Sequence, residues 1–230
     1  MSVSALDKSY DIDTHTRESH NCYSYLLNLK SKAAKKLCEK ELKFNDLCRR
    51  SQPGYAAGFP SLKTRDFNCP TIVKRTLADN PSIKQSTFND ACPKDTYKGA
   101  IVVAPGRDYH YYRLNDEGYW THKPGWKPST AYDAKNNLIK NPELASRNYG
   151  ELNYRDFCGY VCVPRDPTKK RMTLYNPIDN HMPNITNEYN QTPLPKKRKT
   201  GKNRNQNKNG NRNKTGKTGN KNRNRNKLRN

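Results

Sequence analysis

The sequence is poor in apolar residues. Only 32% of its 230 residues are hydrophobic, whereas apolar residues, counted with glycine, make up roughly 45–50% of an ordinary globular domain. No stretch approaches the roughly 18 consecutive apolar residues that a membrane-spanning helix needs. The first twenty residues carry Asp7, Asp11, Asp13 and Glu18, where a signal peptide would have an apolar core. These absences predict a protein without a membrane span that is cytoplasmic at synthesis and not secreted.

Acidic residues are absent from the last 35 positions. The chain has 44 Lys and Arg against 21 Asp and Glu, a net charge of +23, and 15 of these cations lie in residues 196–230. The cations of this tail are Lys196, Lys197, Arg198, Lys199, Lys202, Arg204, Lys208, Arg212, Lys214, Lys217, Lys221, Arg223, Arg225, Lys227 and Arg229. Such a composition cannot form a packed core. We expect a disordered tail that binds nucleic acid or another polyanion through phosphate contacts, without sequence preference. The alternatives are a localisation patch or a solubilising extension.

The remaining sequence divides by composition into three further parts. Residues 1–20 are polar and without periodicity, which predicts a mobile N-terminal arm or, alternatively, a peripheral strand. Residues 21–164 hold the candidate core and form one domain. Residues 165–195 are proline-rich and read as a linker to the tail.

Helical patterns precede strand patterns within this domain. Asn21 is a suitable N-cap for a helix that begins at Cys22, a second helix is expected between residues 30 and 50, and a third covers 69–78. The expected strands follow at residues 99–104, 108–114, 119–123 and 156–164. This order predicts an α+β fold in which N-terminal helices pack on a small antiparallel sheet.

The seven cysteines are an odd number in a chain without an export signal. Reduced thiols are therefore expected rather than a disulfide framework. Cys158 and Cys162 raise the question of zinc, but they share one face of a strand and no second close pair completes a tetrahedral site. Neither a phosphate loop nor a dinucleotide fingerprint occurs. No metal and no cofactor are predicted.

One set of residues could carry chemistry. A cysteine in the first turn of a helix feels the positive end of the helix dipole, which favours the thiolate of Cys22. His110, in the middle of an expected strand, would act as its base, and His122 on the next strand would orient the imidazole. The alternatives are that Cys22 is a small buried hydrophobe and that His122 caps a hairpin.

These residues resemble a known superfamily. Asn21-Cys22-Tyr23-Ser24-Tyr25, then Gly99 to Val103, His110 and the Trp120 to Gly125 hairpin are similar to papain-like cysteine hydrolases of the NlpC/P60 or CHAP type, over about residues 20–164. The acidic residue usual after the glycine is Ala100 here, and a long insertion separates helix and sheet. The resemblance implies a papain-like fold and a cysteine peptidase or amidase acting on a peptide or amide substrate.

A second hypothesis treats the domain as catalytically silent. Low-complexity Asn and Lys joined to such a domain resembles proteins of large DNA viruses of the mimivirus group. The implied protein is virion-associated or structural and binds nucleic acid through its basic tail.

Overall fold

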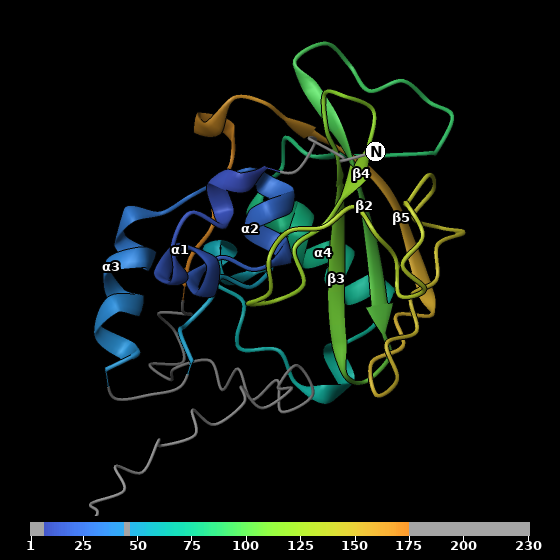
Figure 1. Cartoon of the computed structure of the whole chain (residues 1–230). Helices are drawn as coiled ribbons and strands as arrows, with labels where there is room; N and C mark the ends of the chain where they lie inside the picture. Colours follow the sequence, from blue (N-terminus) through green and yellow to red (C-terminus); the bar gives the residue numbers. More distant parts are fainter. Residues whose placement is uncertain (1–6, 44–46, 175–230) are drawn as a thin grey trace, which may run out of the picture. The chain divides into compact units, whose positions relative to one another are not determined.

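The computed structural model describes residues 7–43 and 47–174, and it confirms a mixed α+β fold with a small antiparallel sheet (Figure 1). The helices are α1 (Thr14–Ser19), α2 (Cys22–Leu27), α3 (Lys32–Glu41) and α4 (Cys69–Asp79), with short 3-10 turns at Lys8–Tyr10, Tyr55–Ala57, Thr64–Asp66 and Pro167–Lys169. The strands are β1 (Lys84–Ser86), β2 (Thr96–Ala104), β3 (Asp108–Leu114), β4 (Trp120–Thr121) and β5 (Asp156–Pro164).

Polar caps decide where the helices begin. Asn21 accepts hydrogen bonds from the first turn of α2, and Ser31 and Asn68 cap α3 and α4 in the same way. α2 ends at Leu27 because Asn28 adopts a left-handed conformation with φ of 49°, which asparagine tolerates better than most residues. The second expected helix, between residues 30 and 50, forms as α3.

The sheet has the order β1-β5-β2-β3-β4. The last strand, β5, inserts between β1 and β2, so the chain returns to the centre of the sheet after a long excursion. β1 was not predicted because Lys84, Gln85 and Ser86 show no apolar alternation. The two outermost strands are short, which limits edge-to-edge pairing with other chains.

Both faces of the sheet are covered. Ile101 and Val103 of β2 join an apolar core with residues of α2 and α4. Ala100 and Val102, which alternate with them, join a second core with residues from the irregular segment 124–155. Burial on both faces explains why β2 reads as a continuous apolar run, since neither face is left for polar side chains.

The helix layer lies very close to the sheet at Gly99. A Cβ atom at this position would lie 2.3 Å from Cδ1 of Leu26 in α2. Glycine is therefore needed here for close approach rather than for an unusual backbone conformation.

Three disulfides join six of the seven cysteines: Cys38–Cys48, Cys69–Cys158 and Cys92–Cys162. The expectation of reduced thiols is wrong. Two of the pairs span 89 and 70 residues, and only the return of β5 to the sheet brings their members together. The odd count arises because Cys22 is the free cysteine.

Both ends of the described chain pack against the folded domain. Tyr10, which falls within the expected N-terminal arm, is fully buried. Met172 packs against the first core, and the Arg171 backbone N–H donates to the side chain of Asn80. The rest of the expected linker and the fifteen cations of the tail lie outside the described residues.

Candidate functional site

The predicted nucleophile, Cys22, is the first residue of α2. The side-chain oxygen of Asn21 accepts hydrogen bonds from the backbone N–H groups of Tyr23 and Ser24, both at 3.2 Å. The prediction that an asparagine-capped helix opens at this cysteine is confirmed.

The Cys22 thiol forms hydrogen bonds with the backbone of β3. Its sulfur lies 3.9 Å from the carbonyl oxygen of Tyr109 and accepts a hydrogen bond from the backbone N–H of Tyr111. β2 pairs with one edge of β3, and on the other edge β4 pairs only with Arg113 and Leu114. The thiol therefore lies against a stretch of β3 whose edge away from β2 has no strand.

The environment of this thiol favours its protonated form. Cys22 is 5% exposed. Burial, and after it the negative charge of Asp108, raise the pKa of Cys22 well above the ordinary value for a thiol. A buried thiolate loses its hydration, and the dipole of a six-residue helix does not compensate for that loss. The expectation of a thiol activated by a low pKa is wrong.

The two predicted histidines do meet. Nε2 of His110 and Nδ1 of His122 are 2.8 Å apart, and Nε2 of His122 donates to the carbonyl oxygen of Tyr132 at 3.0 Å. Because a carbonyl can only accept, His122 carries its proton on Nε2, and His110 donates to its Nδ1.

Both imidazoles are held in the neutral form. Burial lowers the pKa of His122 to about 4. Burial, and then the neighbouring His122, lower the pKa of His110 well below its usual range. Two buried rings that share a hydrogen bond cannot readily carry positive charge, because a protonated ring would be desolvated and would repel its neighbour.

The histidines and the thiol pack in different cores. The ring of His110 contacts the rings of Tyr112 and Tyr154, which both belong to the second core. Cys22 belongs to the first core. Successive side chains of a strand point to opposite faces. Within the described residues, no hydrogen bond or ring contact joins Cys22 to His110, whose Nε2 bonds His122 instead.

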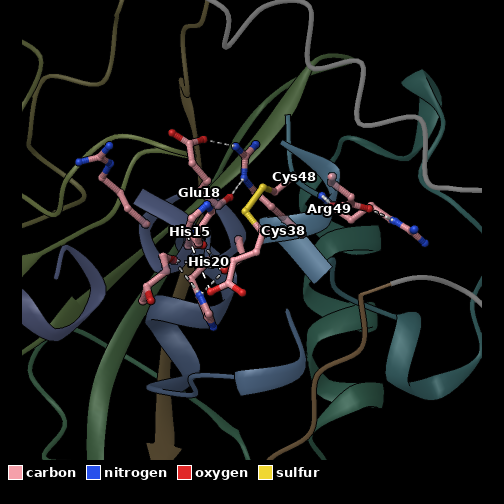
Figure 2. Close-up of a disulfide and its surroundings, with 12 residues drawn as sticks. His15, Glu18, His20, Cys38, Cys48 and Arg49 are labelled. Carbon is pink, nitrogen blue, oxygen red and sulfur yellow. Dashed lines mark hydrogen bonds and ion pairs between the residues drawn. A yellow bond between two sulfur atoms is a disulfide. The ribbon is translucent and has the colours of Figure 1, made fainter. Parts of the chain in front are cut away.

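Sequence reasoning missed a second group of buried polar residues, around the Cys38–Cys48 disulfide (Figure 2). Arg50 donates to the backbone carbonyl of Glu18 and pairs with its carboxylate. The ring of His20 bonds the Thr16 carbonyl oxygen at 2.8 Å and accepts from the Ser31 backbone N–H at 2.9 Å. These contacts join α1 to the start of α3 and to the segment after it, so this group is structural.

A lysine was also missed. The Lys123 side chain is fully buried, and its ammonium donates to the carbonyl oxygens of Arg17 and Gly125 at 2.6 and 2.8 Å. Burial lowers the pKa of Lys123 to about 7. Its neighbours in the sequence give no signal of this role, because the two carbonyls come together only in the folded chain.

Cys158 and Cys162, considered above for zinc, belong to two different disulfides. Across residues 7–43 and 47–174, no group of three or more His, Cys, Asp and Glu side chains is arranged to hold a metal ion. No helix in the same residues is long and apolar enough to cross a bilayer.

Comparison with known proteins gives one informative match. No protein-family model matches the chain, and no solved structure matches it. The chain is similar to a shell protein. Insoluble matrix shell protein 1 of the clam Ruditapes philippinarum is 28% identical over 157 residues, which cover 68% of this chain and 86% of the relative.

This similarity corrects the predicted function. We expected a papain-like cysteine peptidase or amidase. That expectation is contradicted by a relative that is named as a matrix protein. The second hypothesis, in its structural form, agrees better with the match. The expectation of a cytoplasmic, non-secreted protein is contradicted as well, because a shell matrix is an extracellular material. The viral origin stays a prediction that none of these findings tests.

Proposed function

We propose that the protein is a structural component of an extracellular matrix. The observation that carries this proposal is the similarity to the clam matrix protein, which extends over 86% of that relative. A match of this extent covers most of the relative and about two thirds of this chain.

The covalent structure supports the same proposal. Disulfides form and persist in oxidising compartments and are rare in the cytosol. Cys69–Cys158 ties the start of α4 to β5, and Cys92–Cys162 ties the loop before β2 to the same strand. A domain cross-linked by such disulfides resists unfolding, which suits a protein that must persist outside the cell.

The state of the candidate catalytic residues also supports it. Cys22 has a raised pKa and a thiol held by the backbone of β3. His110 and His122 bond each other on the second core. Each of these groups has a hydrogen-bond partner inside the fold, as buried polar groups do in a structural core.

Localisation in the source organism tests the proposal. Antibodies against the purified protein should stain extracellular matrix, and fractionation should recover the protein in the matrix residue that survives salt and detergent extraction. An intracellular marker protein serves as the control. Recovery mainly in the soluble cytosolic fraction would refute an extracellular structural role.

The papain-like arrangement expected for the fold is also a proposal. We propose that the body retains a papain-like arrangement as a scaffold, which is supported by a helix that opens at Cys22 beside the strand that carries His110. An experimental structure tests it by the order and direction of its strands. A strand order that differs from that of papain-like proteins would contradict the proposal.

The basic tail adds a proposed partner. We propose that residues 196–230 bind nucleic acid or another polyanion without sequence preference, because 15 cations there face no acidic residue in the same segment. The full-length protein and a full-length variant with these cations replaced by Gln are compared by titration with DNA at several salt concentrations. Equal affinities of the two proteins would refute binding through the tail.

A further inference from the structure

Helix α3 presents a row of lysines on its outer side. Lys32, Lys36 and Lys40 are all exposed and follow one another at intervals of four residues. This spacing places side chains on one face of a helix, with about 6 Å between successive Cα atoms along the axis. Figure 1 shows α3 at the outer side of the helical layer, away from the sheet. We call these three residues the lysine row.

The acidic residues of α3 do not neutralise this row. Glu41 is buried and pairs with Arg49, while Glu39 lies 4.0 Å from His15. Lys35, on the side of α3 toward α1, pairs with Asp13 at 2.8 Å. In the described part of the chain, no ion pair or side-chain hydrogen bond involves a residue of the lysine row.

The fold holds this helix in place despite repulsion within the row. Like charges four residues apart destabilise a helix. The opposite side of α3 is anchored by buried Ala34 and by the disulfide of Cys38 with Cys48 (Figure 2). The Ser31 side chain caps its start. The row is therefore a rigid, uncompensated line of positive charge, and a partner with a matching line of negative charge would relieve the repulsion.

We infer that the lysine row is a docking surface for an acidic polysaccharide, a chain that carries sulfate or carboxylate groups along its length. Lysine ammonium groups bind such anions as point charges. α3 has no aromatic side chain, and stacking on aromatic rings is the usual means of holding bases of single-stranded nucleic acid. The choice of a polysaccharide over nucleic acid rests on the proposed extracellular function, where polysaccharide is the abundant polyanion.

Two full-length variants with the same charge change test the inference. K32Q/K36Q/K40Q removes the lysine row. K94Q/K135Q/K140Q removes three exposed lysines that lie outside the helices. Both variants keep the basic tail, so its contribution is common to them and to the unaltered protein. Binding to dextran sulfate is titrated at several salt concentrations, with uncharged dextran as the blank and duplex DNA as competitor.

The row variant should bind dextran sulfate about tenfold more weakly near physiological salt, as expected for the loss of two or three exposed ionic contacts. The slope of log affinity against log salt concentration should be less steep by about two for this variant, since each lost contact contributes roughly 0.7–0.9 to the slope. The control variant should change little in either quantity. Thermal unfolding of the row variant should occur at the same temperature or higher, because repulsion is removed, so weak binding would not reflect misfolding.

Equal losses in the two variants would overturn the inference, because net charge alone would then explain binding. It would also be overturned if, in a full-length protein whose tail cations are replaced by Gln, DNA at equal charge concentration competed as well as free dextran sulfate, since the row would then not favour polysaccharide. Failure of the extracellular proposal is a separate result. A cytosolic location would leave the difference between the two variants unchanged.

Discussion

The two long disulfides should stabilise the body in a coupled way. Taken alone, a cross-link across 89 residues stabilises the folded state by about 4.6 kcal/mol through the entropy of the unfolded chain. When Cys92–Cys162 is intact, however, the unfolded chain already connects the same two points by a shorter route through residues 69–92 and 158–162. That route is about 27 residues long, and closing it is worth only about 3.5 kcal/mol by the same relation.

A double-mutant cycle measures this coupling. C69A/C158A and C92A/C162A should each lose about 3.5 kcal/mol of unfolding free energy, and removal of both pairs should lose about 8 kcal/mol, which exceeds the sum of the separate losses by about 1 kcal/mol. The assay is urea unfolding in oxidising buffer, followed by the fluorescence of Trp120, which is 3% exposed. Each variant needs its own denaturant slope, because a less cross-linked chain exposes more surface on unfolding.

The third disulfide provides the matched control. Cys38–Cys48 spans 10 residues, so its removal should lose about 2.7 kcal/mol. Its loop shares no residues with the loops of the other two bridges, and its loss should therefore add to either of theirs. Strict additivity of the two long bridges, or a loss under about 1 kcal/mol for either one, would refute the reasoning from shared loops.

Three further predictions follow from single sites. Acid should destabilise the protein, because His122 takes up a proton below about pH 6.5 in the unfolded chain but only near pH 4 when it is buried in the folded protein. The contribution of His122 to stability is therefore complete above pH 6.5 and falls by about 3 kcal/mol toward pH 4. Urea unfolding of H122N at several pH values should show a weaker pH dependence than the unaltered protein, and an unchanged dependence would contradict this. Iodoacetamide at neutral pH should leave the native protein unmodified, because the Cys22 thiol is buried and its pKa is raised. After unfolding without reductant, mass spectrometry should detect one label, at Cys22. Rapid labelling of the native protein would mean that the thiol is not buried as described. G99A should lower the unfolding free energy by about 1–3 kcal/mol, because the added methyl group overlaps Leu26, and a neutral effect in thermal or urea unfolding would show that α2 packs less closely on the sheet.

The sequence by itself determined most of the secondary structure. The cap at Asn21, the strand runs in 99–104 and 108–114, and the late strand at 156–164 all depend on local rules of capping and periodicity, and the structure has elements at these places. The helices-then-strands order was enough to give the α+β class. Local rules failed at the short polar strand β1, which has no apolar alternation.

The predicted site illustrates what a sequence pattern leaves open. A helix start at Cys22 and a histidine in the middle of β3 were both identified correctly as local features. Whether a helix-start thiol is activated depends on its solvation, and whether it meets a histidine depends on which face of the strand that histidine occupies. Both are tertiary properties. In this fold the thiol is buried against the edge of β3, and the imidazole of His110 belongs to the core of the opposite face.

Tertiary structure also decided the state of the cysteines. Spacing along the chain could not pair Cys69 with Cys158 or Cys92 with Cys162, because the members of each pair become neighbours only after β5 has inserted between β1 and β2. Composition determined that the chain would be basic and low in apolar residues. Which lysines of α3 face solvent was decided by the disulfide and the buried side of the helix, since these contacts leave the opposite side, with its lysine row, exposed.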